Sequence, residues 1–183
     1  MVLKQMKSLR LSCLLFVLCN LVNLVFSNSL KPSELSIPAS IIGEKWNGPK
    51  GLVVDTFENL NNSMVKSLKK TVEPLGVIAM ADYTYTDKKN VFNTITIRLF
   101  VFETKALRKK FCDKKYYSDE AKKLYKESKK IDYIILDSLQ VNKRIIIYDK
   151  YFITGSQLLT KGNDHTGILQ KYLTKIKTFS NIK

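Results

Sequence analysis

The sequence predicts a single α+β domain, in which amphipathic helices pack on one face of a largely antiparallel β-sheet. Two long segments, 77–86 and 91–102, alternate apolar and polar residues on either side of the short polar stretch 87–90, as in a β-hairpin. Segments with apolar residues at helical spacing precede and follow this hairpin. A sheet with one apolar face is expected to carry helices on that face, which gives the predicted class.

The N-terminus has the three parts of a secretory signal peptide. Residues 1–10 contain three basic residues and no acidic one, and residues 11–26 are almost wholly apolar. Val25 and Ser27 then stand at the −3 and −1 positions of a cleavage site. We expect a signal peptide over residues 1–27, cleaved near Ser27, and export to the periplasm or to the outside of the cell. The alternative is an uncleaved membrane anchor, although the apolar run is shorter than the roughly 20 residues of a spanning helix.

The mature chain is expected to begin with an irregular arm. Residues 28–50 contain Pro32 and Pro38, which discourage a helix, followed by a loop rich in glycine and proline. Residues 51–54 suit a short strand at the start of a domain that runs to residue 183. Asp55, with Glu58 three residues later, fits a capping box, so the spacing predicts a helix over about 56–71.

The segment after the hairpin is expected to form two helices. Thr104 is a suitable N-cap for a helix that ends near Tyr116, and Ser118 for a second helix over about 119–130.

Three strands and a final helix are expected in the last third of the chain. The strands are predicted at 131–137, 143–148 and 151–155, the last two joined by a tight turn at residues 149–150. Apolar residues at helical spacing from Ile168 to Ile176 predict the last helix, capped by Asp164 or Thr166.

The charge of the chain points to an anionic partner. The sequence has 31 basic and 16 acidic residues, a net charge of +15, and without the three basic residues of the signal peptide the net charge is +12. Residues 104–130 contain eleven basic and four acidic residues. They are the best candidate for a surface that meets an anionic membrane or polymer. The alternative is a pair of ordinary solvated helices, and the spread of the lysines over more than one side of each helix favours it. The candidate anion-binding residues are Lys105, Arg108, Lys109, Lys110, Lys114, Lys115, Lys122 and Lys123.

No catalytic or metal-binding motif is present. The only histidine, His165, follows Asp164, but neighbours in sequence seldom have the geometry of a base and its orienting carboxylate. We expect these residues to lie in a polar loop that starts the last helix. The chain has no ligand spacing typical of zinc or calcium, so we expect no metal and no cofactor.

Three single residues have two interpretations each. Trp46 is either a platform on which a ligand stacks or a plug that holds the N-terminal arm on the sheet. Cys112 is the only cysteine of the mature chain, so we expect no internal disulfide and favour a buried thiol over pairing with another chain. Asn61 begins a glycosylation sequon, which matters only in a eukaryotic secretory pathway.

These observations favour an exported, non-catalytic domain that binds a ligand or partner. One alternative is a basic surface module that binds an anionic membrane, a polysaccharide or nucleic acid through residues 104–130. A weaker alternative is a metal-free enzyme that uses carboxylates.

Overall fold

The computed structural model describes residues 30–58, 62–158 and 164–181. The chain divides into two compact units, residues 1–30 and 31–183, and the helices and strands named below belong to the second unit. Within the described residues, no helix combines the length and the apolar character needed to cross a membrane. The predicted signal peptide and the alternative anchor lie outside the described residues.

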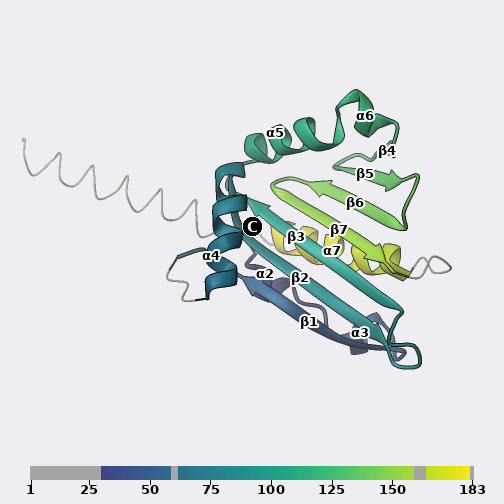
Figure 1. Cartoon of the computed structure of the whole chain (residues 1–183). Helices are drawn as coiled ribbons and strands as arrows, with labels where there is room; N and C mark the ends of the chain where they lie inside the picture. Colours follow the sequence, from purple (N-terminus) through teal and green to yellow (C-terminus); the bar gives the residue numbers. More distant parts are fainter. Residues whose placement is uncertain (1–29, 59–61, 159–163, 182–183) are drawn as a thin grey trace, which may run out of the picture. The chain divides into compact units, whose positions relative to one another are not determined.

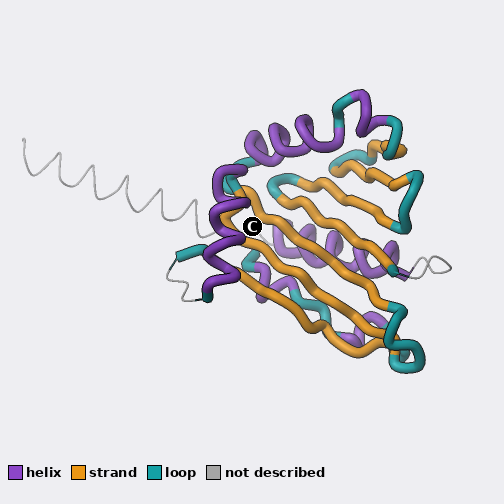
Figure 2. Tube along the Cα trace, viewed as in Figure 1, coloured by secondary structure: helices purple, strands orange, loops and turns teal. Residues whose placement is uncertain are grey.

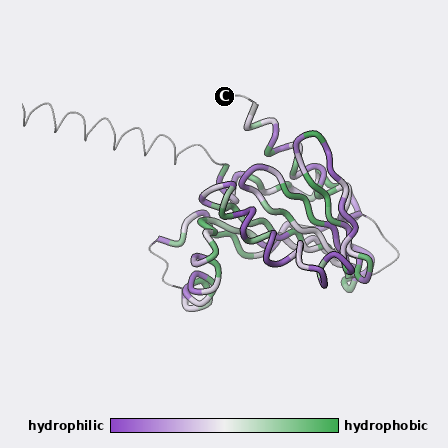
Figure 3. Tube along the Cα trace, turned by 90° about the horizontal axis from the view of Figure 1, so that it is seen from above, coloured by the Kyte–Doolittle hydropathy of each residue, from purple (hydrophilic) through white to green (hydrophobic). Residues whose placement is uncertain are grey.

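A seven-stranded antiparallel sheet forms the centre of this unit (Figures 1 and 2). The strand order is β1-β2-β3-β7-β6-β5-β4, so the pairing of β3 with β7 joins the N-terminal and C-terminal halves. Hydrophobic residues run through the central strands, which are green in Figure 3. The strands are β1 (Trp46–Val54), β2 (Val77–Asp87), β3 (Thr94–Phe102), β4 (Tyr125–Lys129), β5 (Tyr133–Ser138), β6 (Lys143–Tyr148) and β7 (Tyr151–Gln157).

Helices lie against both faces of the sheet. α7 (Asp164–Asn181) packs on β7, β6 and β3, and α5 (Lys105–Tyr116) contacts β3 and β7 from the other side. The predicted α+β class is confirmed, and the helical layer on the second face is an addition to the predicted single layer. Its cause lies in β3 and β7, where Phe100, Phe102 and Phe152 give the second face an apolar end that α5 covers.

The face under α7, which we call the α7 face, is tightly packed and includes a hydrogen-bonded tyrosine pair. The hydroxyl of Tyr85 donates to the carbonyl of Ile37 at 2.8 Å and lies 2.7 Å from the hydroxyl of Tyr172. Tyr83 donates to the carbonyl of Pro32. Burial raises the pKa of Tyr85 to about 12. These contacts hold the segment before β1 against the sheet.

The N-terminal segment is more regular than predicted. It contains two one-turn helices, α2 (Pro32–Leu35) and α3 (Ala39–Ile42), and β1 begins at Trp46. The two prolines do not prevent these helices because Pro32 occupies the first helical turn and Pro38 the N-cap, where the missing N–H has no helical partner to lose.

The first long helix begins later than predicted. α4 (Ser63–Val72) is capped by Asn62, whose side chain accepts from the backbone N–H of Met64 at 2.9 Å. It continues into the 3₁₀ turn η1 (Glu73–Leu75). Asp55 is not its cap, because its carboxylate accepts instead from the backbone N–H and the hydroxyl of Ser33.

The predicted helix over 119–130 is wrong for most of its length. α6 (Asp119–Lys122) is a single turn, capped by Ser118 as predicted, and the chain then forms β4. β4 pairs with β5 from Tyr125 to Lys129, so the gain from strand pairing outweighs the local helix propensity of these lysines. By contrast, α5 begins at the predicted cap, where the Thr104 hydroxyl accepts from Leu107 N–H at 3.2 Å.

Candidate functional site

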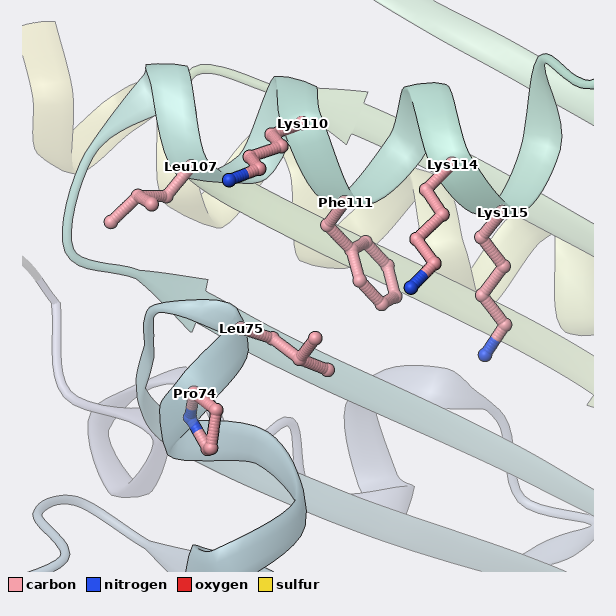
Figure 4. A pocket seen from close by; sticks show the side chains of 7 residues that line it. All are labelled: Pro74, Leu75, Leu107, Lys110, Phe111, Lys114 and Lys115. Atoms are coloured by element: carbon pink, nitrogen blue, oxygen red, sulfur yellow. The ribbon is translucent and has the colours of Figure 1, made fainter.

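A groove of about 510 Å³ lies between η1 and α5, and we call it the η1–α5 groove (Figure 4). Figure 4 shows side chains from α5 extending toward η1, whose Pro74 and Leu75 lie opposite. The lining is apolar apart from three lysines. The lining residues are Pro74, Leu75, Leu107, Lys110, Phe111, Lys114 and Lys115.

Helical spacing brings the α5 residues to one side. Leu107, Lys110, Phe111 and Lys114 follow the i, i+3, i+4, i+7 pattern, which places their side chains along one stripe of a helix. Lys115 extends the stripe at the C-terminal end of the groove.

Gly76 allows η1 to approach α5. It has a φ of 81°, in the left-handed region that favours glycine, and it ends η1. A Cβ at this position would lie only 2.6 Å from Cδ1 of Leu107. The carbonyl of Gly76 also accepts from the N–H of Glu103 at 2.9 Å, which fixes the turn beside the start of α5. The two sides of the groove are therefore held together by backbone contacts.

The aromatic floor of the groove is continuous with the core. The ring of Phe111 packs edge-on against Phe152, with centroids 5.3 Å apart, and against Phe100 at 6.3 Å. It also meets Phe102 at 5.3 Å. Leu75 contributes an exposed apolar side chain on the other side. The floor is thus rigid, while the rim is open to solvent.

The three lysines of the groove are uncompensated. Among the residues that the structure describes, Lys110, Lys114 and Lys115 have no carboxylate partner. The one acidic residue of α5, Asp113, pairs with Lys109 at 2.6 Å instead. The ammonium of Lys115 lies 5.4 Å from the centre of the Phe111 ring, directly beside the apolar floor. Apolar surface and positive charge therefore meet along one edge.

Further positive charge lies beyond the Lys115 end. Arg98 of β3 and Lys143 of β6 occupy the α5 side of the sheet, on either side of β7, as the strand register shows. Burial lowers the pKa of Lys143, and the charges of Lys115 and Arg98 lower it further. Arg98 itself is paired with Asp82 through two hydrogen bonds of 2.7 and 2.8 Å. Lys143 thus adds a positive charge near this end, while Asp82 offsets that of Arg98.

The predicted anion-binding residues differ in exposure and in their place relative to the groove. Lys110, Lys114 and Lys115 line the groove, whereas Lys105 and Lys109 are exposed on α5 outside its lining. The two lysines of the α6 region, Lys122 and Lys123, are exposed as well, and Lys122 pairs with Asp119. Arg108 is only 8% exposed, so its guanidinium is not available on the surface. It lies beside Cys112, whose thiol is buried and has a pKa raised by burial to about 11.

The sequence analysis did not single out the apolar part of the groove. Leu107 and Phe111 lie within the helix predicted from Thr104 to near Tyr116, and Pro74 and Leu75 follow the helix predicted over about 56–71. A signal was present in the 107/110/111/114 spacing, which alternates apolar and basic residues on one helical stripe. No sequence pattern connects this stripe to Leu75, thirty residues earlier.

Trp46 is buried rather than displayed. Its side chain is 3% exposed at the start of β1, and the ammonium of Lys45 lies 5.0 Å from the ring centre. This placement offers no open ring face to a ligand. Asn61, which begins the glycosylation sequon, lies outside the described residues.

His165 lies in the first turn of α7 and not in a loop. It is 3% exposed, and its Nδ1 atom has no hydrogen-bond partner in the described part of the chain. Burial lowers its pKa, and the nearby Arg144 lowers it further. Asp164 is paired with Lys45 at 2.8 Å, so its carboxylate is not a partner that orients the imidazole. The cap position of α7 precedes Asp164 and falls on a residue outside the described ranges.

A small polar pocket of about 270 Å³ adjoins His165. It is lined in part by Asp137 and Arg144, which form a bidentate pair with one bond of 3.0 Å. Within residues 30–58, 62–158 and 164–181, no group of three or more His, Cys, Asp or Glu residues could hold a metal ion.

Comparison with known proteins gives little further information. No family model matches the sequence, and no curated protein matches it. Among solved structures, the chain is similar to the extracellular domain of PknH from Mycobacterium tuberculosis, with a TM-score of 0.42 and 11% sequence identity. The match covers 83% of this chain and 94% of that one. A likeness of this degree carries no argument about the site.

Proposed function

We propose that the protein is an exported, non-catalytic binding domain whose η1–α5 groove holds an amphipathic anion, a molecule with an apolar chain and an anionic head group. The observation that carries this proposal is the combination of an apolar floor with three unpaired lysines on one rim. Export is proposed from the signal-peptide pattern of residues 1–27.

The dimensions and the lining suit such a ligand. The volume of about 510 Å³ is within the range of small-molecule sites, which are typically apolar with a few placed polar groups. Each methylene group buried in the groove would contribute about 0.8 kcal/mol. Lysine ammonium groups act as point charges and bind either a carboxylate or a phosphate head group. The apolar chain would therefore lie along Leu75, Leu107 and Phe111, with the head group near Lys115.

The groove supports this function better than the two alternatives from the sequence. A polymer-binding surface would use all the lysines of residues 104–130, but Lys109 and Lys122 are engaged by carboxylates and Arg108 is buried. An enzyme that uses carboxylates would need them in its cleft, and the groove lining contains none.

Titration with dodecanoate, a single-chain fatty acid anion, tests the proposal. Replacing the groove lysines together (Lys110→Gln, Lys114→Gln, Lys115→Gln) is expected to weaken binding at least about tenfold in isothermal titration calorimetry, because charge-assisted contacts are lost. The matched control removes three exposed lysines outside the groove (Lys123→Gln, Lys126→Gln, Lys130→Gln) and is expected to change affinity less than about twofold.

Two results would contradict the proposal. One is equal weakening by the control, which would indicate a general charge effect. The other is unchanged binding in Leu75→Gln, which makes the apolar wall polar and should weaken binding of dodecanoate.

A further inference from the structure

A second apolar surface lies at the opposite end of the sheet from the groove. It consists of the β2–β3 loop (88–93), the β5–β6 loop (139–142) and the end of β7, which lie toward the right of Figure 1. Five large apolar side chains in this region are each at least 60% exposed. We call them the loop platform: Val91, Phe92, Leu139, Val141 and Leu158.

The three parts of the loop platform are adjacent because of the strand order. β3, β7 and β6 are consecutive in the sheet, so their ends at this edge are spaced about 5 Å apart. Backbone hydrogen bonds join them: Leu158 N–H donates to the carbonyl of Thr94 at 3.0 Å, and Gln157 N–H to that of Asn142 at 3.1 Å. The side chain of Gln157 also donates to Asn93 at 3.0 Å. The bases of the three parts are therefore adjacent at this edge of the sheet.

The Phe92 side chain is exposed in a loop whose conformation is fixed by hydrogen bonds. The backbone N–H of Phe92 donates to the side chain of Asn90 at 3.1 Å, and that of Lys89 donates to Asp87 at 2.8 Å. These side chain–backbone bonds are typical of tight turns and define the loop conformation. Phe92 remains 73% exposed in this ordered turn, although burial of so large an apolar side chain is favourable. An exposed apolar cluster of this kind is typical of an interaction surface.

The charge beside the platform indicates the partner. Lys88 and Lys89 are exposed in the same loop as Val91 and Phe92. The one acidic residue of this turn, Asp87, accepts hydrogen bonds from Lys89 N–H and from the Asn93 side chain. Apolar side chains on loops with lysines beside them suit the surface of an anionic bilayer, and the chain has a net charge of +15. The apolar side chains would contact the acyl chains, and the lysines would contact the anionic head groups.

We infer that the loop platform docks on the surface of an anionic lipid bilayer, with its apolar side chains at the boundary between the head groups and the acyl chains and with Lys88 and Lys89 against the head groups. This inference does not depend on the ligand of the groove, because the two surfaces share no residue.

Vesicle binding of the exported form of the protein tests this inference. The platform variant Phe92→Ser/Leu158→Ser is expected to lower the partition coefficient onto phosphatidylglycerol vesicles at least about tenfold, because two inserting side chains become polar. The matched control, Met64→Ser/Ile131→Ser, changes two exposed apolar residues of α4 and of the turn before β5, outside the loop platform, and should bind like the unchanged protein. The groove variant Lys110→Gln/Lys114→Gln/Lys115→Gln should keep at least half of the vesicle affinity, so failure of the two proposals can be told apart.

A second measurement reports insertion directly. Trp46 is the only tryptophan and is buried, so vesicles with brominated acyl chains should not quench it. In Phe92→Trp, the introduced indole should be quenched. Absence of this quenching, equal binding of the control and platform variants, or equal binding to neutral phosphatidylcholine vesicles would each overturn the inference. Binding to a protein partner with no vesicle binding would overturn it as well.

Discussion

The two faces of the sheet differ in how completely they are covered. On the α7 face, Tyr83, Tyr85, Ile97 and Ile153 alternate along their strands with almost no exposure, and α7 closes over them. On the face that α5 contacts, one end is apolar and covered, while Asp82, Thr84 and Thr96 are half-buried and Arg98 is exposed. We call this second surface the α5 face.

This difference indicates that the α7 face determines the stability of the domain, whereas under the proposed function the groove on the α5 face determines binding. The α7 face buries large side chains and satisfies its internal tyrosine hydroxyls, as expected of a core. The cover of the α5 face ends at the groove, whose three lysines have no carboxylate partner among the described residues and, under the proposed function, bind the ligand. Substitutions on the α7 face should therefore reduce stability, and substitutions in the groove should reduce binding.

The largest expected effect comes from a cavity on the α7 face. Leu169 is fully buried, so Leu169→Ala should lower the free energy of unfolding by about 2–5 kcal/mol. Leu107→Ala in the groove removes the same atoms from a half-buried position and should lower the free energy of unfolding by no more than about 1 kcal/mol. Urea unfolding followed by circular dichroism compares the two. Similar losses in both variants would mean that the faces do not differ in this way.

A smaller effect is expected from adding one methyl group to the same face. A Cβ at Gly155 would lie 2.7 Å from Cγ of Leu169 and 3.2 Å from Cδ1 of Ile97. Gly155→Ala should therefore lower the free energy of unfolding by about 1–3 kcal/mol, because the added methyl group overpacks the core. Gly167→Ala is the matched control, because a Cβ there meets nothing within 4 Å and alanine favours the helix by up to about 1 kcal/mol. A neutral Gly155→Ala would show that α7 is loosely packed.

The smallest effect concerns the pH dependence of stability. His165 is the only histidine of the chain. Burial and the nearby charge of Arg144 lower its pKa from 6.5, and the charges of Asp137 and Asp164 oppose this shift only in part. The unfolded state therefore binds more protons than the folded state below about pH 6.5, so stability should fall as the pH falls through this value toward the lower folded pKa.

Thermal unfolding of the unchanged protein and of His165→Gln between pH 7.5 and 5 tests this dependence. The unchanged protein should lose more stability than the variant over that interval. An equal slope in the two proteins would show that the imidazole is not shielded from protonation.

Local patterns were sufficient to predict many elements. The alternation in 77–102 predicted the β2–β3 hairpin, Thr104 predicted the start of α5, and the spacing from Ile168 to Ile176 predicted α7. Each depends on side chains within one or two turns or on one strand. Asp55 was misassigned because its partner, Ser33, lies 22 residues earlier in the chain. The segment 119–130 was misassigned because β4 forms through pairing with the next strand, β5, which the composition of the segment itself does not show.

The candidate site shows the same division. The lysines of α5 were recognised as a basic segment, and their spacing already placed Lys110 and Lys114 on one stripe. Lys109 differs from them because it pairs with Asp113, four residues later on the same helix, a spacing that the sequence already contains. The apolar wall of the groove came from η1, and its approach depended on the contact of Gly76 with Leu107.

The sequence by itself therefore determined the α+β class, the main hairpin, the principal helix stripes and the basic character of α5, because periodicity and capping act over a few residues. Only the tertiary structure decided which lysines remain unpaired, which apolar residues face them, and that three loop tips meet at one edge. Those outcomes depend on strand order and on contacts between segments far apart in the chain, which no local pattern contains.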